Sequence, residues 1–376
     1  MAKILKQEDG SPERVLHLAL ELSNKSWKLG FSDGERIRLK SIAAGDLGSL
    51  DEELKKTKAR YGLAPDCRVV SVYEAGRDGF WIHRALAQRG IENVVVDSAS
   101  IEVNRKQRRV KTDRVDVEAL LRQLERYHRG ERKALAVVRV PTEADEDQRR
   151  PSRERERLLQ ERGAHKVRIE SLLVAQGVRR KLDAGLMEEL DELSSPAGYP
   201  LGADLKAEIR REYQRYRQAH EQILEIERIQ EARVAAAEGP AMAQVAQLLG
   251  LRGIGWVTSW VLVVEFFAWR EFRNRKELAA CAGLTPTPYA SGDMMRDQGI
   301  SKAGSRRIRS LLVEIAWLWL RYQPNSTLTL WFNRRFAKGG KRMRRVGIVA
   351  MARKLLVALW RYVEHGELPE GAVLSA

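Results

Sequence analysis

Lys111-Thr112-Asp113-Arg114-Val115-Asp116 opens a predicted helix that runs to about His128. Asp113 and Asp116 are three residues apart, so their Cβ atoms lie about 5–6 Å apart on one face of that helix. Two carboxylates held this close repel each other, and a divalent cation is a common reason for holding them together. The alternative is a first-turn pair favoured by the helix dipole, with nearby lysine and arginine side chains as counter-ions. The pair alone leaves both interpretations open.

Apolar segments before this helix predict a mixed sheet. Strands are expected over 15–21, 25–31, 36–41, 68–74 and 93–97, and helices over 46–61 and 79–89. Asp33-Gly34 is a hairpin turn signal between the second and third strands. A last strand is expected over 134–140, where it stops at Pro141. The succession predicts an α/β sheet covered by helices, and it is the one seen in RNase H-like folds.

Two further acids fall at the ends of predicted strands. Glu21 ends the first strand and Glu74 the middle one. In an RNase H-like arrangement these positions converge with Asp113 and Asp116 at one edge of the sheet. Hard oxygen ligands of this kind suit Mg²⁺ or Mn²⁺, and two such ions would activate the attacking oxygen and stabilise the leaving oxygen at a phosphodiester. For Glu21 alone, a surface acid that ends a strand is an equally good interpretation.

Composition points to a polyanionic partner. The chain has 376 residues, 44% of them hydrophobic, and a formal charge of +16, with a pI of about 9.9. A balance this basic in a folded chain favours nucleic acid as the partner. Cys67 and Cys281 have no CxxC partner, which argues against a disulfide framework and a zinc site. The most apolar run, 256–268, is shorter than a membrane span and contains Glu265, so a cytoplasmic protein without a membrane partner is expected.

Composition changes after Pro141, which predicts a second part of the chain. Residues 142–162 are crowded with charge, and apolar spacing then predicts a helix to about Leu193. A loop over 194–202 and a second helix from Leu205 suggest an antiparallel hairpin or coiled coil. It could join protomers, whereas a plain helical linker without a partner is the alternative. The expected division is 1–12 disordered, 13–145 α/β domain, 146–242 helical hairpin and 243–376 all-α C-terminal domain.

The C-terminal part contains candidate phosphate contacts. Leu249-Gly-Leu-Arg-Gly253-Ile-Gly255 resembles the hairpin of a helix-hairpin-helix element, where Gly253 and Gly255 would let backbone N–H groups approach a phosphate. A tight helix–helix turn with no ligand explains the pattern equally well. Basic residues expected to bind phosphates rather than to read bases are Lys302, Arg306, Arg309, Arg334, Arg335, Lys338, Lys341, Arg342, Arg344 and Arg345. The alternative for the cluster at 334–345 is a solvated surface.

Ser291-Gly292 lies in a segment, 282–292, that proline and glycine predict to be a loop. A serine on a glycine-flanked loop can be approached closely by a substrate, but its hydroxyl is a weak nucleophile until a base or metal removes its proton. No histidine lies near it in sequence, so a Ser-His-Asp hydrolase has little support. On spacing alone, Ser291 is most simply a turn residue.

Taken together, these segments resemble the IS-one-ten (IS110) family of insertion-sequence transposases. The matching segments are Leu18-Ala-Leu-Glu21, Val72-Tyr-Glu74-Ala, Lys111 to Asp116, Gly253-Ile-Gly255, Ala282-Gly-Leu-Thr-Pro, Ala290-Ser291-Gly292 and Ile300-Ser-Lys-Ala-Gly304 followed by Arg309. They run through nearly the whole chain in the family's order. The resemblance implies a RuvC-like DEDD domain joined to a C-terminal transposase domain with a catalytic serine.

The resemblance also implies roles and partners. Glu74, Asp113 and Asp116 would bind metal, and Ser291 would attack DNA to form a covalent phosphoserine. A structured non-coding RNA encoded by the element would guide the enzyme by pairing with donor and target DNA, and the enzyme would act as a dimer or tetramer. It would work in the cytoplasm of a bacterium or archaeon, at the nucleoid. One departure is Glu21, since the family's first acid is usually Asp, and the longer side chain puts metal positioning in doubt.

Two other classes of protein stay open. A metal-dependent nuclease or Holliday-junction resolvase would use only the four acids, with water as the nucleophile. An inactive nucleic-acid-binding protein is conceivable because of Glu21. Cleavage that leaves serine-linked DNA, free ends or no product would separate the three.

Overall fold

The computed structural model describes residues 14–97, 113–291 and 294–375, and of residues 113–114, 289–291 and 294–298 it describes the backbone alone. The disorder expected at 1–12 lies outside the described residues. The chain forms two compact units, Met1–Pro141 and Thr142–Ala376. The three-domain division expected from the sequence stays a prediction.

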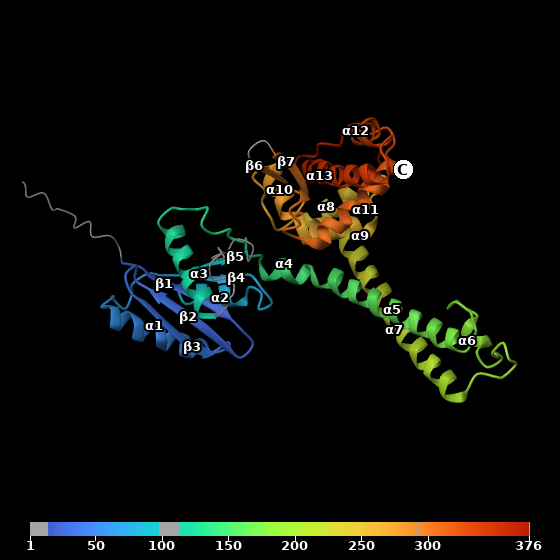
Figure 1. Ribbon diagram of the computed structural model, residues 1–376, viewed down its shortest axis with the longest axis horizontal. Helices are drawn as coiled ribbons and strands as arrows, with labels where there is room; N and C mark the ends of the chain where they lie inside the picture. Colours follow the sequence, from blue (N-terminus) through green and yellow to red (C-terminus); the bar gives the residue numbers. More distant parts are fainter. Residues whose placement is uncertain (1–13, 98–112, 292–293, 376) are drawn as a thin grey trace, which may run out of the picture. The chain divides into compact units, whose positions relative to one another are not determined.

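Unit 1 is built on a five-stranded sheet of order β3-β2-β1-β4-β5 (Figure 1). The strands are β1 (Leu16–Leu22), β2 (Ser26–Ser32), β3 (Ile37–Ala43), β4 (Val69–Glu74) and β5 (Glu92–Val96). The first three pair antiparallel, whereas β4 is parallel to both β1 and β5. The five strands and the mixed α/β class are therefore confirmed.

The sixth strand, expected over 134–140, is wrong. Val137 makes only an isolated bridge to Val96, supported by hydrogen bonds from Val138 N–H to Val95 and from Asp97 N–H to Ala136. The segment thus meets only the end of β5 and then reaches Pro141, which has no N–H to continue a ladder.

Helices cover both faces of the sheet. Leu16, Leu18 and Leu20 of β1 pack with α1 (Leu47–Tyr61) and α2 (Trp81–Ala87). Ala19 points to the other face, where it packs with Val117 of α3 (Asp113–His128). Because side chains alternate along a strand, the odd-numbered residues of β1 face α3.

Unit 2 begins with a helical hairpin. Its helices are α4 (Glu143–Gln148), α5 (Arg150–Ala175), α6 (Leu186–Glu189) and α7 (Ala203–Ala235). Arg155 pairs with Glu227, and His165 pairs with Glu212. Partners that rise along α5 and fall along α7 show that the two helices are antiparallel (Figure 1).

The first helix of the hairpin ends earlier than the sequence suggested, at Ala175 rather than near Leu193. Gly177 has φ +79°, and its N–H donates to the carbonyl of Val174 while that of Val178 donates to Leu173. These bonds cap the helix with a left-handed glycine. A side chain at Gly177 would also meet the ring of Pro196, at 2.7 Å.

The rest of unit 2 packs around one core that includes Trp260, Phe266 and Trp319. Its helices are α8 (Pro240–Leu249), α9 (Trp256–Leu262), the π-helical turn η3 (Val263–Phe267), α10 (Arg275–Cys281), α11 (Arg306–Tyr322), α12 (Thr327–Phe336) and α13 (Lys341–His365). A β-hairpin of β6 (Pro286–Ser291) and β7 (Met294–Ile300) lies among them.

This hairpin corrects the expectation of an all-α C-terminal part and of a loop around Ser291. Pro286 and Pro288 cannot donate to a helix, and each favours an extended residue before it. A two-stranded ribbon tolerates them because neither outer edge pairs with another strand that the structure describes. The register shifts between Pro286 and Pro288. In the described residues no helix is long and apolar enough to cross a membrane.

Candidate functional site

Glu21 and Glu74 lie side by side at the carboxyl ends of β1 and β4. The parallel register runs to the pair Leu20 and Tyr73, so the two glutamates occupy the next level. By alternation both fall on the α3 face, in line with Ala19 and Val72, which pack there. Neighbouring strands are about 4.8 Å apart, and both glutamates are half-buried.

Helix α3 begins at the same end of the sheet. A Cβ added to Gly30, the β2 partner of Ala19, would lie 2.4 Å from Cγ1 of Val117, which fixes where the helix crosses. Its last residue, His128, contacts His17 near the start of β1, with Nδ1 and Nε2 3.1 Å apart. The helix therefore runs antiparallel to β1, and its first turn, with Asp113 and Asp116, lies toward the ends that carry Glu21 and Glu74.

The four acids suit a hard divalent cation in chemistry, because all are carboxylates. They also share one face and one end of the sheet. Among the side chains that the structure describes, however, no three acid, histidine or cysteine residues are close enough together to hold a metal ion. That set includes Glu21, Glu74 and Asp116 but not the side chain of Asp113, so the predicted metal site stays a prediction.

Ser291 is the last residue of β6 and pairs with Met294 of β7. The foot of this hairpin is clasped by two glycine segments. A Cβ on Gly283 would lie 2.2 Å from the carbonyl oxygen of Ala303, and one on Gly304 would lie 2.3 Å from that of Cys281. Both glycines have positive φ, +67° and +93°. Backbone contact this close needs glycine, so the clasp fixes the hairpin between α10 and α11.

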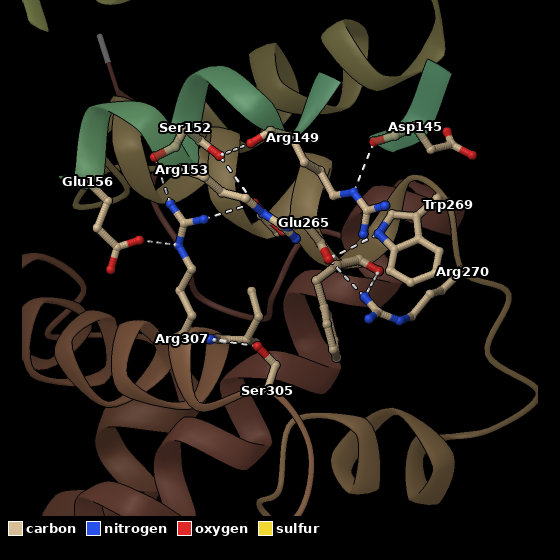
Figure 2. Close-up of polar contacts among 12 residues, drawn as sticks. Asp145, Arg149, Ser152, Arg153, Glu156, Glu265, Trp269, Arg270, Ser305 and Arg307 are labelled. Carbon is tan, nitrogen blue, oxygen red and sulfur yellow. Dashed lines mark hydrogen bonds and ion pairs between the residues drawn. The ribbon is translucent and has the colours of Figure 1, made fainter. Parts of the chain in front are cut away.

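A buried carboxylate anchors the helical hairpin to the core of unit 2 (Figure 2). Glu265, in the middle of η3, is only 8% exposed. Arg153 of α5 donates from Nε and Nη2 at 2.9 and 2.8 Å, and Arg307 of α11 donates from Nη1 at 2.8 Å. Ser152 Oγ donates at 3.2 Å, and Arg307 also bonds the Ser152 carbonyl.

Burial by itself would raise the pKa of Glu265, but the hydrogen bonds from Arg153 and the charges of Arg153 and Arg307 bring that pKa below its ordinary value. The carboxylate is therefore ionised at neutral pH. Because α11 starts directly after the glycine clasp, one anion ties the hairpin helix α5 to the element that supports Ser291.

Two further arginines surround the same turn. Arg270 donates to the carbonyl of Glu265 at 2.8 Å, and its guanidinium carbon lies 3.7 Å from the ring centroid of Trp269. The guanidinium of Arg149 lies 4.7 Å from the same centroid. Burial lowers the pKa of Arg270 to about 10, so it stays cationic at neutral pH. Four arginines thus gather around Glu265 and the aromatic ring beside it (Figure 2).

The predicted phosphate contacts fall into different environments. Gly253, with φ +90°, packs against Tyr322, whose Cβ would be 2.8 Å from an added Cβ, whereas Gly255 caps α9 beside open space. Arg309 donates to the carbonyls of Ala282 and Lys302, so its guanidinium supports the clasp. Arg306 is exposed.

The basic cluster of 334–345 divides in two. Lys341, Arg342 and Arg345 line a groove together with Lys302. The other members are exposed but do not line it: Arg334, Arg335, Lys338 and Arg344.

Sequence reasoning missed the Glu265 network and half of the groove. Glu265 was visible as a lone acid in the most apolar run of the chain, which is a signal of a paired buried charge. Arg353 and Arg361 line the groove with Arg342 and Arg345. They recur along α13 at helical spacing, and that spacing was the available signal.

The fold and these sites together define a basic protein suited to nucleic-acid chemistry, and comparison with known proteins makes the class specific. Residues 245–330 match the model of the Transposase IS116/IS110/IS902 family. The chain is 44% identical over 380 residues to the Sinorhizobium fredii protein named "Putative transposase y4rJ", covering 96% of this chain and 95% of that protein.

Shorter similarities agree. The transposase for insertion sequence element IS1328 of Yersinia enterocolitica is 30% identical over 149 residues, 39% of this chain and 42% of its own. The transposase for insertion sequence element IS1111A of Coxiella burnetii is 30% identical over 117 residues, 31% of each chain. The chain belongs to the IS116/IS110/IS902 family of transposases, as its motifs predicted, so it is an enzyme of DNA transposition whose substrate is DNA.

Proposed function

We propose that the protein cuts and rejoins DNA through a covalent bond between Ser291 and a strand end, assisted by the four acids of unit 1. The observation that carries the proposal is the placement of Glu21 and Glu74 on adjacent parallel strands, on the face where α3 begins with Asp113 and Asp116. Strand order and pairing also support a RuvC-like, RNase H-like assignment for this unit.

Each residue has one task in this scheme. The oxygen of Ser291 forms a bond to the scissile phosphorus, and the 3′ or 5′ oxygen of the DNA leaves with the bonding electrons and gains a proton. A free strand end later displaces the serine oxygen, which regains its proton, so the phosphodiester bond is conserved and no nucleotide triphosphate is consumed. Glu21, Glu74, Asp113 and Asp116 would hold Mg²⁺ or Mn²⁺, which when bound neutralises charge that develops on the phosphate.

The proposal includes two partners. A net charge of +16 suits a guide RNA as well as donor and target DNA. The antiparallel pair α5 and α7 offers a surface for assembly of a dimer or tetramer, and Val167, Val174 and Ile229 are among its exposed apolar residues.

The test is capture of the covalent adduct. The full chain is incubated with donor and target DNA, the element's RNA and Mg²⁺, and serine-linked DNA is detected by gel shift after denaturation. Ser291→Ala should abolish the adduct. Ser301→Ala is the matched control, because Ser301 is an exposed serine at the foot of the same hairpin. An undiminished adduct in Ser291→Ala would rule out the proposed nucleophile.

A metal-dependent nuclease that uses water is the second candidate. It is favoured by the fact that all four acids belong to unit 1, whereas Ser291 belongs to unit 2. Free DNA ends, produced equally by the wild type and Ser291→Ala and lost in Asp116→Asn, would establish this function instead. Binding without cleavage by the wild type, with the RNA supplied, would indicate an inactive nucleic-acid-binding protein.

A further inference from the structure

A long groove crosses unit 2 beside the foot of the Ser291 hairpin. It has a volume of about 1330 Å³. One wall is α13 from Lys341 to Arg361, and the opposite side includes the start of β6 and the end of β7 at Pro286 and Ile300. The first turn of α10, part of α12 and residues 367–370 complete it. The groove belongs to the same compact unit as Ser291.

The groove carries an excess of cations. Six lie on α13: Lys341, Arg342, Arg345, Arg353, Lys354 and Arg361. Three more come from α10 and the clasp, namely Arg275, Lys276 and Lys302. The acids in the lining are Glu367 and Glu370, so nine cations face two carboxylates.

These cations are mostly unpaired. Arg361 approaches Glu367 at 3.9 Å, and within the described chain the other eight form no ion pair. Arg153 and Arg307, by contrast, each form an ion pair with the Glu265 carboxylate. Like charges lined along one groove repel each other, and a polyanion would relieve that repulsion.

Apolar side chains also line the groove, and we call them its floor. They include Leu284, Ile300, Leu328, Trp331, Val346 and Val349. Trp331 is half-buried, and the ammonium of Lys354 lies 4.7 Å from its ring centroid. A duplex presents mainly phosphates to a protein surface, whereas a single strand also presents base faces, which pack on apolar and aromatic side chains.

We propose that this groove binds an unpaired segment of nucleic acid, with its phosphates along α13 and its bases against the floor around Trp331. Arg342 and Arg361 are separated by a rise of about 28 Å along α13. That length leaves room for several phosphates of one strand. The segment would enter or leave beside Pro286, five strand residues or about 17 Å from Ser291.

The inference rests on the proposed function in one respect, since it assigns the bound strand to the reaction at Ser291. It explains why the clasp at Gly283 and Gly304 is so closely packed. The clasp holds one wall of the groove and the serine-bearing hairpin as a single piece.

The test measures binding by the full chain without divalent metal, so that no strand is cut. The probes are a fluorescent oligothymidylate of about eight nucleotides, within the site sizes typical of single-strand grooves, and a duplex of equal length. The variant of the α13 cations, called the rim variant, is Arg345→Gln with Arg353→Gln. The matched control is Arg211→Gln with Arg228→Gln, which removes the same charge from exposed positions of α7 outside the groove.

The rim variant should weaken single-strand binding about tenfold or more at moderate salt and reduce the salt slope by about 1.4, since each phosphate contact to a single strand contributes about 0.7. The control should change affinity less than about twofold. Trp331→Leu should weaken the single strand about tenfold, as loss of base stacking does, and leave duplex binding unchanged. Because Trp331 is half-buried, Lys354→Gln is the second floor variant, and it keeps the indole.

Equal effects of the rim variant and the control would overturn the proposal, and so would duplex binding as tight as single-strand binding. Tighter binding of polyglutamate than of the oligonucleotide would assign the groove to an acidic protein segment instead. The readout does not involve the serine adduct. Loss of the adduct with intact binding would overturn the proposed function alone, and a normal adduct with no rim effect would overturn the groove alone.

Discussion

Replacing Glu265 by alanine should destabilise unit 2 more than any loss of a surface ion pair. The carboxylate side chain is 7% exposed and receives hydrogen bonds from Arg153, Arg307 and Ser152. Removing one partner of a buried ion pair typically costs about 3–5 kcal/mol, because the remaining charge stays buried without compensation.

The cost here should fall at or somewhat below the lower end of that range. Arg153 is 53% exposed and Arg307 26% exposed, so both can regain water when Glu265 is lost. Arg149 and Arg270 are more buried, and burial already lowers the pKa of each. We expect about 2–4 kcal/mol for Glu265→Ala, and less for Glu265→Gln, which keeps a hydrogen-bond acceptor.

Thermal unfolding of the full chain checks this magnitude. For a unit of the size of Thr142–Ala376, each kcal/mol lowers Tm by about 2–4 °C, so the expected loss is about 5–15 °C. The control is Glu221→Ala on α7, whose partner Arg217 is 60% exposed. An exposed pair of this kind contributes at most about 1 kcal/mol. A Tm for Glu265→Ala equal to that of the control would refute the reasoning.

The stabilisation by Glu265 should depend on pH. The pKa of Glu265 is lowered in the folded state, because the arginine hydrogen bonds and charges outweigh the burial that would raise it. A lowered carboxyl pKa stabilises the fold fully above the unfolded value of about 4.3, and that stabilisation is lost as pH falls through the folded value. The difference in Tm between wild type and Glu265→Ala should therefore shrink below about pH 4.3. A difference that is constant across this window would contradict the assignment.

Three glycine substitutions test the packing that positions the two sites, each by thermal unfolding. Gly304→Ala should cost more than about 3 kcal/mol, because its Cβ would meet the Cys281 carbonyl at 2.3 Å. The control Gly366→Ala, with the same sign of φ but open space around it, should cost only about 1 kcal/mol. Gly253→Ala should cost about 2–3 kcal/mol through φ strain and contact with Tyr322, and stability within error of wild type would contradict the packing. Gly30→Ala should displace α3 and lower stability by about 1–3 kcal/mol. It should also reduce Mg²⁺-dependent cleavage. Unchanged cleavage would show that the place where α3 crosses the sheet does not control the proposed acid site.

The sheet of unit 1 could be predicted because each strand has a recognisable local sequence pattern. The apolar runs that became β1, β4 and β5 are short, rich in valine or leucine, and bounded by turn residues or charge. The acids at their ends could be placed from the same pattern, since parallel neighbours end at the same edge. The error at 134–140 arose because a strand needs a partner along its length, and this segment meets only the end of β5.

The β6–β7 hairpin could not be predicted from local pattern. Its first strand contains two prolines, and its second has no clear alternation. What fixes it is the contact between segments that are distant in sequence, Cys281 to Gly283 with Ala303 to Gly304. The glycines that permit that approach resemble ordinary turn glycines when only the sequence is known, and a tertiary contact decides their role.

The net charge of +16 can be assigned to a surface only after cations in ion pairs are distinguished from cations without a carboxylate partner. Arg153 and Arg307 hold the helical hairpin to the core and are neutralised by Glu265, so they are not available to a polyanion. The groove along α13 holds nine cations against two carboxylates, an excess of seven. Like charges gathered around one groove repel each other, and the nucleic-acid segment that we propose there would relieve that repulsion. The same reasoning explains why charge density along the sequence was only a partial guide. It identified 334–345, of which some members lie away from the groove. It missed Arg353 and Arg361, which line the groove about two helical turns apart on α13.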